Sequence, residues 1–360
     1  MADGALYAPS IIRNGLLGEA LALLGIEGIG VRHIDVHAHA IGVGDGGTGC
    51  WANPRTRWGL GLLCRMARPR SAGRAPSQDQ RWAQLLRATA DGATCVDHVV
   101  VLALDAVHDA AGRRLFDPTS LFIPNDYVFR LCGEHPKFLP GASVHPDRRD
   151  ALEELHRVAE RGAVLIKWLP NAQQIDPADA RLTPFYRALV ALGLPLLSHL
   201  GHEYSLGRSG QHLGDPRRLR RALEEGVTVI GAHCASAGLA DDGRENFLHF
   251  VDVARRYPNL YGDLSALTLM NRWRYLRRIL REEGLLPRLL NGTDYPLPPC
   301  GLCFAREVGA RRAWSLARIP NLFERDHAIK RAMGVPGEVF ARGYQVLPVA
   351  RSLQRLRRSA

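Results

Sequence analysis

Lysine is nearly absent from this sequence, although the chain is strongly basic. Only three of its 47 lysine and arginine residues are lysines, Lys137, Lys167 and Lys330. The compact, titratable ammonium of lysine and the planar, permanently charged guanidinium of arginine are not interchangeable. A position that keeps lysine in this background is therefore a candidate for chemistry that needs a primary amine.

Long apolar runs and dense cysteines are also lacking. No stretch approaches the roughly 18 uninterrupted apolar residues that a membrane helix requires. Glu19 and Glu27 interrupt the amino-terminal segment where a signal peptide would need a continuous apolar core. The seven cysteines are odd in number and scattered through 360 residues, unlike those of a disulfide scaffold. We expect a soluble, cytoplasmic protein with reduced thiols.

The net charge of +11 raises the question of a nucleic-acid or membrane-surface partner. Clustered cations attract polyanions, but arginine is spread along this chain, and only the carboxy-terminal tail, residues 346–360, holds a compact basic run. No zinc-finger or aromatic-basic recognition pattern accompanies the charge. We expect a small-molecule substrate, no specific nucleic acid and no membrane, and we leave open whether the chain forms a homodimer.

Eight short aliphatic or β-branched runs alternate with helical patterns, which is the order of βα units around a parallel sheet. This count predicts an α/β fold, a (β/α)8 TIM barrel over residues 31–345. Residues 1–30 would form a helical extension. Residues 42–80, rich in Gly, Pro and Arg, would be an insertion after the first strand, on the face where barrel active sites form. The runs cover residues 31–37, 98–104, 139–144, 163–168, 194–199, 228–233, 259–264 and 288–294, and the clearest helices cover 149–161, 184–192, 216–225 and 247–257.

The first run ends in two histidines separated by one residue, His37 and His39. Because alternate residues of a strand share a face, we expect Asp35, His37 and His39 to face the barrel interior, and Ile34 and Val36 to face the helices. Two imidazoles at the carboxyl end of one strand can offer two neutral nitrogen ligands to a divalent metal. On their own they could equally be polar groups in a loop mouth.

Three further runs end in residues of the same kind. His199 ends the fifth run, His233 the sixth and Asp294 the eighth, which is where barrel enzymes place their catalytic groups. A lone strand-end histidine is more often a satisfied polar group than a ligand. Five such residues in this order predict a metal site.

The order HxH, His, His, Asp resembles the amidohydrolase superfamily. The segments HIDVHAHA, LSHLGHE, IGAHCAS, LYGDLSAL and NGTDYP are similar to its branch containing aminocarboxymuconate-semialdehyde decarboxylase and related metal-dependent hydrolases, over roughly residues 31–345. The resemblance implies one or two divalent metal ions, expected to be zinc, bound by His37, His39, His199 and Asp294. It implies that His233 binds the metal or orients catalytic water.

Two reactions are compatible with this ligand set. In a hydrolase, metal-activated water attacks an amide, ester or lactone carbonyl; in a non-oxidative decarboxylase, the same groups act on an aromatic or unsaturated acid. Asp294 is the expected proton acceptor and donor, and His233 the expected hydrogen-bond donor to water or oxyanion. We favour hydrolysis because Lys167 leaves room for a second metal.

Lys167 ends the fourth run and is expected to point inward. In superfamily members with two metals, a lysine at this position is carbamylated by carbon dioxide and bridges the ions, whereas members resembling the decarboxylase branch usually have one metal and no bridge. The alternative is a lysine that neutralises a substrate carboxylate or a neighbouring acid. We therefore include Lys167 among the metal ligands and leave both interpretations open.

Polar residues after other runs are candidates for substrate contact, although a polar residue in such a loop is more often plain surface. Arg208 would matter most for an anionic substrate, since guanidinium suits bidentate carboxylate binding. Cys300 and Cys303 have CxxC spacing, but without a second pair they predict two idle thiols. The candidates for substrate contact are His145, Trp168, His202, Tyr204 and Arg208.

Overall fold

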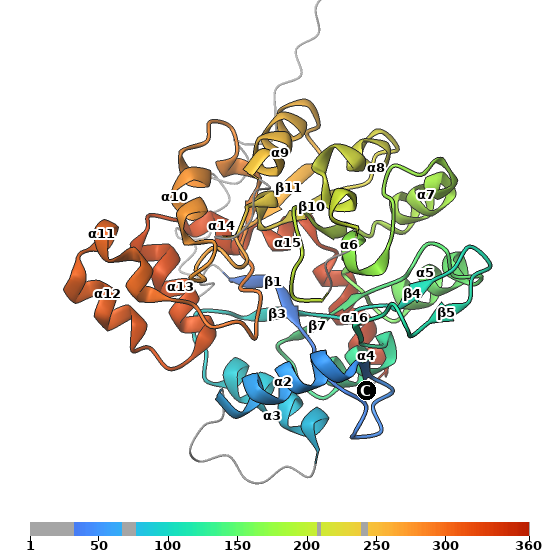
Figure 1. Ribbon diagram of the computed structural model, residues 1–360, viewed down its shortest axis with the longest axis horizontal. Helices are drawn as coiled ribbons and strands as arrows, with labels where there is room; N and C mark the ends of the chain where they lie inside the picture. The colour runs from blue at the N-terminus through green and yellow to red at the C-terminus, as the bar shows by residue number, and fades with distance from the viewer. Residues whose placement is uncertain (1–31, 67–76, 207–209, 239–243, 360) are drawn as a thin grey trace, which may run out of the picture. The chain divides into compact units, whose positions relative to one another are not determined.

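The computed structural model describes residues 32–66, 77–206, 210–238 and 244–359. The described residues from His33 onward belong to one compact unit. The predicted extension over residues 1–30 lies outside the described residues, as does part of the predicted insertion. The compact unit contains a barrel of parallel strands surrounded by helices (Figure 1).

The barrel contains all eight predicted strands. Each overlaps its predicted run, and they pair in sequence order around one parallel sheet. The sheet closes where the amide of Asp294 donates to the carbonyl of His37 at 2.8 Å and Tyr295 forms a parallel bridge with Ala38. The predicted TIM barrel is therefore confirmed. Its strands are β1 (Ile34–His39), β3 (His98–Leu102), β7 (Phe138–Ala142), β8 (Leu165–Trp168), β9 (Leu196–His199), β10 (Val229–Ala232), β11 (Leu260–Asp263) and β12 (Leu289–Leu290).

Helices cover the outside of the barrel, and three of the four predicted ones match within a few residues. The fourth, predicted over 216–225, is a 3-10 turn, η3 (Pro216–Leu219), followed by α8 (Arg220–Glu224). No helix among the described residues has the length and apolar character needed to cross a membrane. The main outer helices are α3 (Gln78–Asp91), α4 (Asn125–Gly133), α5 (Ala151–Glu160), α7 (Thr183–Leu192), α9 (Arg244–Arg256), α10 (Trp273–Arg281), α11 (Ala305–Val308), α12 (Ala310–Ala317) and α13 (Leu322–Ala332).

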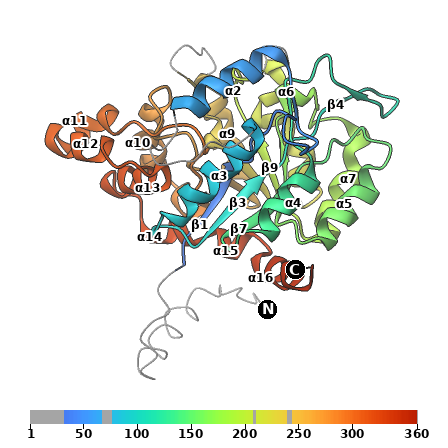
Figure 2. The same cartoon turned by 90° about the horizontal axis from the view of Figure 1, so that it is seen from below.

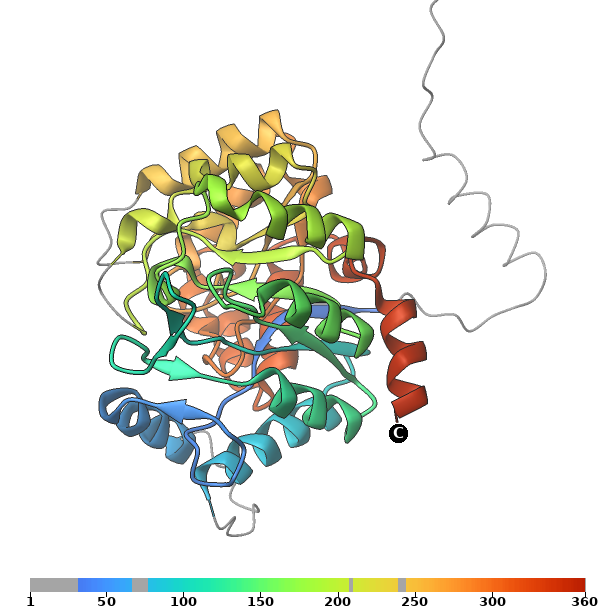
Figure 3. The ribbon, with the colours of Figure 1, turned by 90° about the vertical axis from the view of Figure 1, so that its right-hand side faces the viewer.

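Two helices stand at opposite ends of the barrel (Figures 2 and 3). One is α2 (Pro54–Met66), inside the predicted insertion; the other is α16 (Val349–Ser359), inside the predicted basic tail. Leu347 and Val349 pack with the apolar residues that the strands turn into the barrel, and the Ser352 hydroxyl donates to the carbonyl of Gly162 at 2.6 Å. The tail is therefore a docked helix that closes the end of the barrel opposite α2.

The predicted alternation along the first strand is wrong in its first half. The register of β1 against β3 shifts between Asp35 and Ala38, as at a β-bulge, where two residues of one strand oppose one of its partner. Ile34 and Val36 consequently pack in the apolar cluster to which every barrel strand contributes, and Asp35 turns away from it. The bulge lets His37 and His39 keep their place at the catalytic end.

Asp35 is fully buried beneath the eighth strand. Its carboxylate accepts hydrogen bonds from the Thr293 hydroxyl at 2.6 Å and from the amide of His37 at 2.8 Å. Burial raises the pKa of Asp35 to about 7, despite these bonds. A raised carboxyl pKa favours the folded state most when the group is protonated.

We therefore expect an Asp35→Asn variant to gain stability relative to the natural protein as pH rises. The unfolded carboxyl ionises near pH 4 and the folded one only near 7, so the natural protein loses stability across this window and the amide does not. Urea unfolding at pH 5, 6, 7 and 8 measures the difference. A difference that stays constant over this range, as expected for the exposed Asp252→Asn control, would contradict the assignment.

Candidate metal centre and active site

Three side chains converge at one point, two from the first strand of the barrel and one from the segment after its last strand. His37 and His39 leave β1, and Asp294 follows β12. The Nε2 atoms of the two histidines lie 3.2 Å apart, and Oδ1 of Asp294 lies 3.5 Å from the first and 3.2 Å from the second. The described residues thus place two nitrogens and one carboxylate oxygen within reach of a single cation.

The orientation of His37 shows that these residues fit a metal ion. Its Nδ1 lies 2.8 Å from Oδ2 of Asp263, the last residue of β11. A carboxylate beside Nδ1 accepts a hydrogen bond from the proton on that nitrogen. The lone pair of the ring therefore lies on Nε2, which faces His39 and Asp294. Burial lowers the pKa of His37, and nearby Lys167 lowers it further. The imidazole is therefore neutral, as a metal ligand must be.

Asp263 was not predicted, and it holds more than His37. Oδ1 of Asp263 accepts from the amide of His233 at 2.8 Å and from the amide of Ser265 at 3.1 Å. Burial opposes its charge, but contact with His37 keeps the pKa of Asp263 below its usual range. One carboxylate thus orients two histidines of the site. The signal for it was a carboxylate at the end of the seventh run.

We expect an Asp263→Asn variant to bind divalent metal 10- to 100-fold more weakly, the usual cost of removing such a partner. Asparagine has a single acceptor oxygen, so it cannot accept both from Nδ1 of His37 and from the amide of His233, and the favoured tautomer of His37 is lost. Titration of the metal-depleted protein against a competing chelator measures the affinity. An affinity within twofold of the natural protein would show that the carboxylate is dispensable.

Strained backbone presents the two proposed catalytic side chains. Asp294 has φ +66° and His233 has φ +57°, a left-handed conformation that is rare outside glycine. Two residues before Asp294, a Cβ on Gly292 would lie 2.8 Å from Cβ of His37, so only glycine allows this approach. The buried ammonium of Lys330 donates to the carbonyl of Gly292 at 2.6 Å. The segment after β12 is therefore held from both sides.

The electrostatics of the site keep Asp294 ionised. Burial opposes its charge, yet the surrounding imidazoles, above all His39, hold the pKa of Asp294 well below its usual range. Burial also places the pKa of His233 well below its usual range. The site thus presents an ionised carboxylate, suited to binding a cation, beside an uncharged His233.

His233 and His199 line the same cavity but face different partners. Nδ1 of His233 lies 2.7 Å from the Ser265 hydroxyl, and its ring stacks on His37 with centroids 5.3 Å apart. Nε2 of His199 lies 3.3 Å from the carbonyl of His202 and 3.7 Å from the carboxylate of Glu203. The structure therefore places His199 in the wall of the site, outside the group of three donors.

Lys167 points into the site as the strand alternation predicts. Its Nζ lies 3.3 Å from Nε2 of His37, and the side chain is 1% exposed. Burial lowers the pKa of Lys167 to about 8, so about a tenth of the amine is unprotonated at pH 7, far more than for an ordinary lysine. The structure thus supplies a reactive primary amine beside the donor group.

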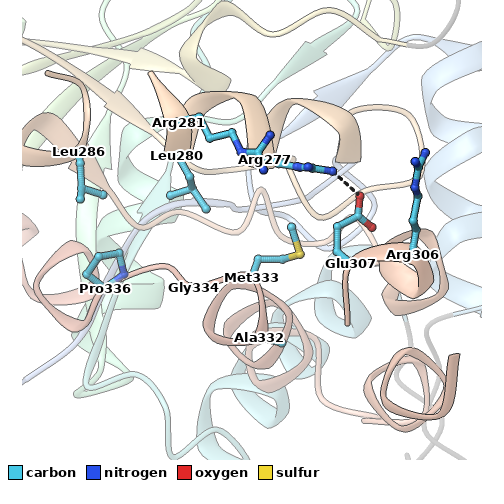
Figure 4. Close-up of a pocket in the computed structure, with 10 residues that line it drawn as sticks. All are labelled: Arg277, Leu280, Arg281, Leu286, Arg306, Glu307, Ala332, Met333, Gly334 and Pro336. Carbon is cyan, nitrogen blue, oxygen red and sulfur yellow. Dashed lines mark ion pairs between the residues drawn. The ribbon is translucent and has the colours of Figure 1, made fainter. Parts of the chain in front are cut away.

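These side chains form the floor of a cavity of about 140 Å³ at the carboxyl ends of the strands. A larger hollow of about 660 Å³ lies between α10, α11 and α13, and Figure 4 shows its lining. It holds three arginines, Arg277, Arg281 and Arg306, with Glu307. Its residues include no strand end and no metal-binding group, so the smaller cavity is the candidate active site.

The sequence matches the family model described as Amidohydrolase over residues 34–312. This chain belongs to the amidohydrolase family. A search of curated proteins finds no match to this amidohydrolase.

Two solved structures support the fold. An uncharacterised TIM-barrel protein from Bordetella bronchiseptica has a TM-score of 0.53 at 18% identity, covering 84% of this amidohydrolase and 99% of that chain. A candidate 2-pyrone-4,6-dicarboxylic acid hydrolase from Pseudomonas putida has a TM-score of 0.50 at 16% identity, covering 91% and 99%. A 5-carboxyvanillate decarboxylase from Sphingomonas paucimobilis has a TM-score of 0.46 at 13% identity. The match covers 86% of this amidohydrolase and 99% of that chain. At these identities the likeness concerns the fold alone.

The predicted substrate contacts of this amidohydrolase are dispersed. Nε2 of buried His145 lies 2.9 Å from the carbonyl of Gln173, and the indole of Trp168 packs near Phe185 of α7. These positions lie outside the lining of the cavity and do not support direct contact. His202 and Tyr204 pair with each other in the loop after β9, and Arg208 lies outside the described residues.

Proposed function

We propose that this amidohydrolase is a metal-dependent hydrolase that attacks an amide, ester or lactone carbonyl with activated water. The observation that carries the proposal is the convergence of His37, His39 and Asp294, with Lys167 3.3 Å from His37. A divalent cation held by these donors would supply acidified water and a polarised carbonyl. Imidazole and carboxylate donors suit zinc.

The residues around this group have separate tasks. Asp294 is ionised, since its pKa lies well below the usual range, and it is the residue proposed to accept the proton of the attacking water and return it to the leaving group. His233, held by the Ser265 hydroxyl on its Nδ1 side, offers its other nitrogen to water or to the developing oxyanion. Asp263 keeps His37 in the tautomer that presents Nε2.

Lys167, as a carbamate, would help to hold a second divalent cation beside the donors His37, His39 and Asp294. Its unprotonated Nζ would attack carbon dioxide and release one proton, and the resulting carbamate carries a negative charge and two oxygens. A negatively charged carbamate would attract a cation next to His37, whereas an ammonium would repel it. Arginine, abundant elsewhere in the chain, cannot perform this reaction because its guanidinium stays protonated.

Product analysis tests the reaction. The metal-loaded protein is incubated with a panel of esters, lactones and amides and, separately, with aromatic and unsaturated carboxylic acids. One new carboxylate per substrate consumed, without gas, and loss of this activity with a chelator would support hydrolysis. Stoichiometric carbon dioxide release from the acids would instead establish the decarboxylase. An active protein that contains no metal would overturn both.

A further inference from the structure

We propose that the part of the substrate distal to the reacting carbonyl is a short, uncharged aliphatic arm, held under α2. This inference rests on the proposed hydrolytic function and names its substrate class. It follows from the other half of the cavity, which the catalytic groups do not occupy.

Aliphatic side chains form the wall above the metal group. They come from loops after three strands, from the short strand β6 (Leu121–Phe122) and from α2. Two of these residues, Leu104 and Ile123, are held together by a pair of backbone hydrogen bonds. The amide of Leu104 donates to the carbonyl of Ile123 at 3.0 Å, and the amide of Ile123 donates to the carbonyl of Leu104 at 2.8 Å. The wall is therefore a formed surface. Its main members are Leu60, Leu63, Leu104, Leu121, Ile123 and Leu169.

The helix α2 contributes the roof. Leu60 and Leu63, three residues apart and so on one helix face, both line the cavity. Leu62 does not line it and is 46% exposed. The predicted insertion thus turns one apolar face toward the site, and a neighbouring leucine on the same helix provides an internal comparison.

The charges in the described lining oppose an anionic arm. Lys167 and Asp294 belong to the proposed catalytic residues on the floor of the cavity. The remaining charged residue of the described lining is Glu203. Its carboxylate accepts from the amides of Ser205 and Leu206, so it is fixed at the edge of the wall. A carboxylate on the substrate arm would lose water against leucine and isoleucine and would approach a like charge.

The size of the cavity sets the length of the arm. An apolar cavity of about 150 Å³ accommodates benzene, and this one measures about 140 Å³. Because this volume includes the space above His37, His39 and Asp294, it accommodates a substrate part of about six carbons with the reacting carbonyl included, so the arm is short.

Two ligands that cannot be hydrolysed test the inference by calorimetry on the metal-loaded protein. They are 2-heptanone and 6-oxoheptanoate, methyl ketones that differ only in a terminal methyl or carboxylate. We expect the neutral ketone to bind at least about tenfold tighter. Leu63→Asp should reduce its affinity at least about tenfold, while Leu62→Asp on the exposed face should leave it unchanged. Leu63→Arg should reverse the preference.

Equal or tighter binding of 6-oxoheptanoate would overturn the inference, as would equal losses in the Leu62 and Leu63 variants. Circular dichroism melting of each variant separates misfolding from loss of the wall, and the reversed preference of Leu63→Arg is a gain that misfolding cannot produce. Because neither ligand reacts, the ketone preference stands or falls independently of whether product analysis finds hydrolysis.

Discussion

An Asp294→Asn variant is expected to lose about 10²- to 10⁴-fold in turnover, the range for removal of a general acid–base group. Asparagine has nearly the same shape, so the segment held by Lys330 and Gly292 should keep its fold. Its amide, however, cannot accept the proton of the attacking water and is a poor cation ligand. Turnover of an ester or lactone found in the product analysis, together with metal content by elemental mass spectrometry, measures the effect.

The matched control for this variant is Asp252→Asn, at an exposed carboxylate of α9. It changes the net charge equally and should keep full turnover and metal content. Asp294→Asn turnover within a few-fold of the natural protein, with metal bound, would show that another group moves the proton. Unchanged melting of both variants would assign the loss to chemistry.

Replacement of Lys167 should have the second large effect. If a carbamate bridges two ions, Lys167→Ala reduces about two metals per chain to one or none and lowers turnover at least about 10²-fold. Lys167→Arg should be equally impaired, because guanidinium keeps the positive charge but cannot react with carbon dioxide. Elemental mass spectrometry on protein expressed with bicarbonate gives the metal count.

A different pattern would identify a plain ammonium. One metal in the natural protein and in both variants, with activity partly retained by Lys167→Arg, would assign Lys167 to charge neutralisation and favour a single-metal site. Lys137→Arg is the control, since its Nζ binds the carbonyls of Ala90 and Ala93 away from the cavity. A carbonyl signal from ¹³C-labelled bicarbonate in the natural protein would confirm the carbamate directly.

The barrel could be predicted because its strands are buried on both faces and end in polar residues. Continuous aliphatic runs mark such strands, and a histidine or aspartate at the end of one or within a few residues after it marks the catalytic end, as at His199, His233 and Asp294. Lys167 was predictable for the same reason. Because parallel strands bring these ends together, their order in the sequence sufficed to place them in one site.

Features that depend on register or on distant partners could not be predicted. A β-bulge has no sequence signature in the first strand, so the direction of Asp35 was wrong. The role of Asp263 depends on contact with His37, 226 positions away. The face that α2 turns to the cavity depends on the packing of an insertion whose Leu60, Leu62 and Leu63 look alike in sequence.

The placement of the three lysines has a consequence for chemical modification. Lys330 is buried and the amine of Lys137 is bound to two carbonyls, so apart from Lys167 inside the active-site cavity, acylating reagents and amine-directed cross-linkers find little to react with on this barrel. Its positive charge is carried by guanidinium groups, which acetylation does not neutralise and which keep their protons throughout the physiological pH range. The basicity of this surface is consequently a fixed property rather than one that lysine-modifying enzymes can adjust.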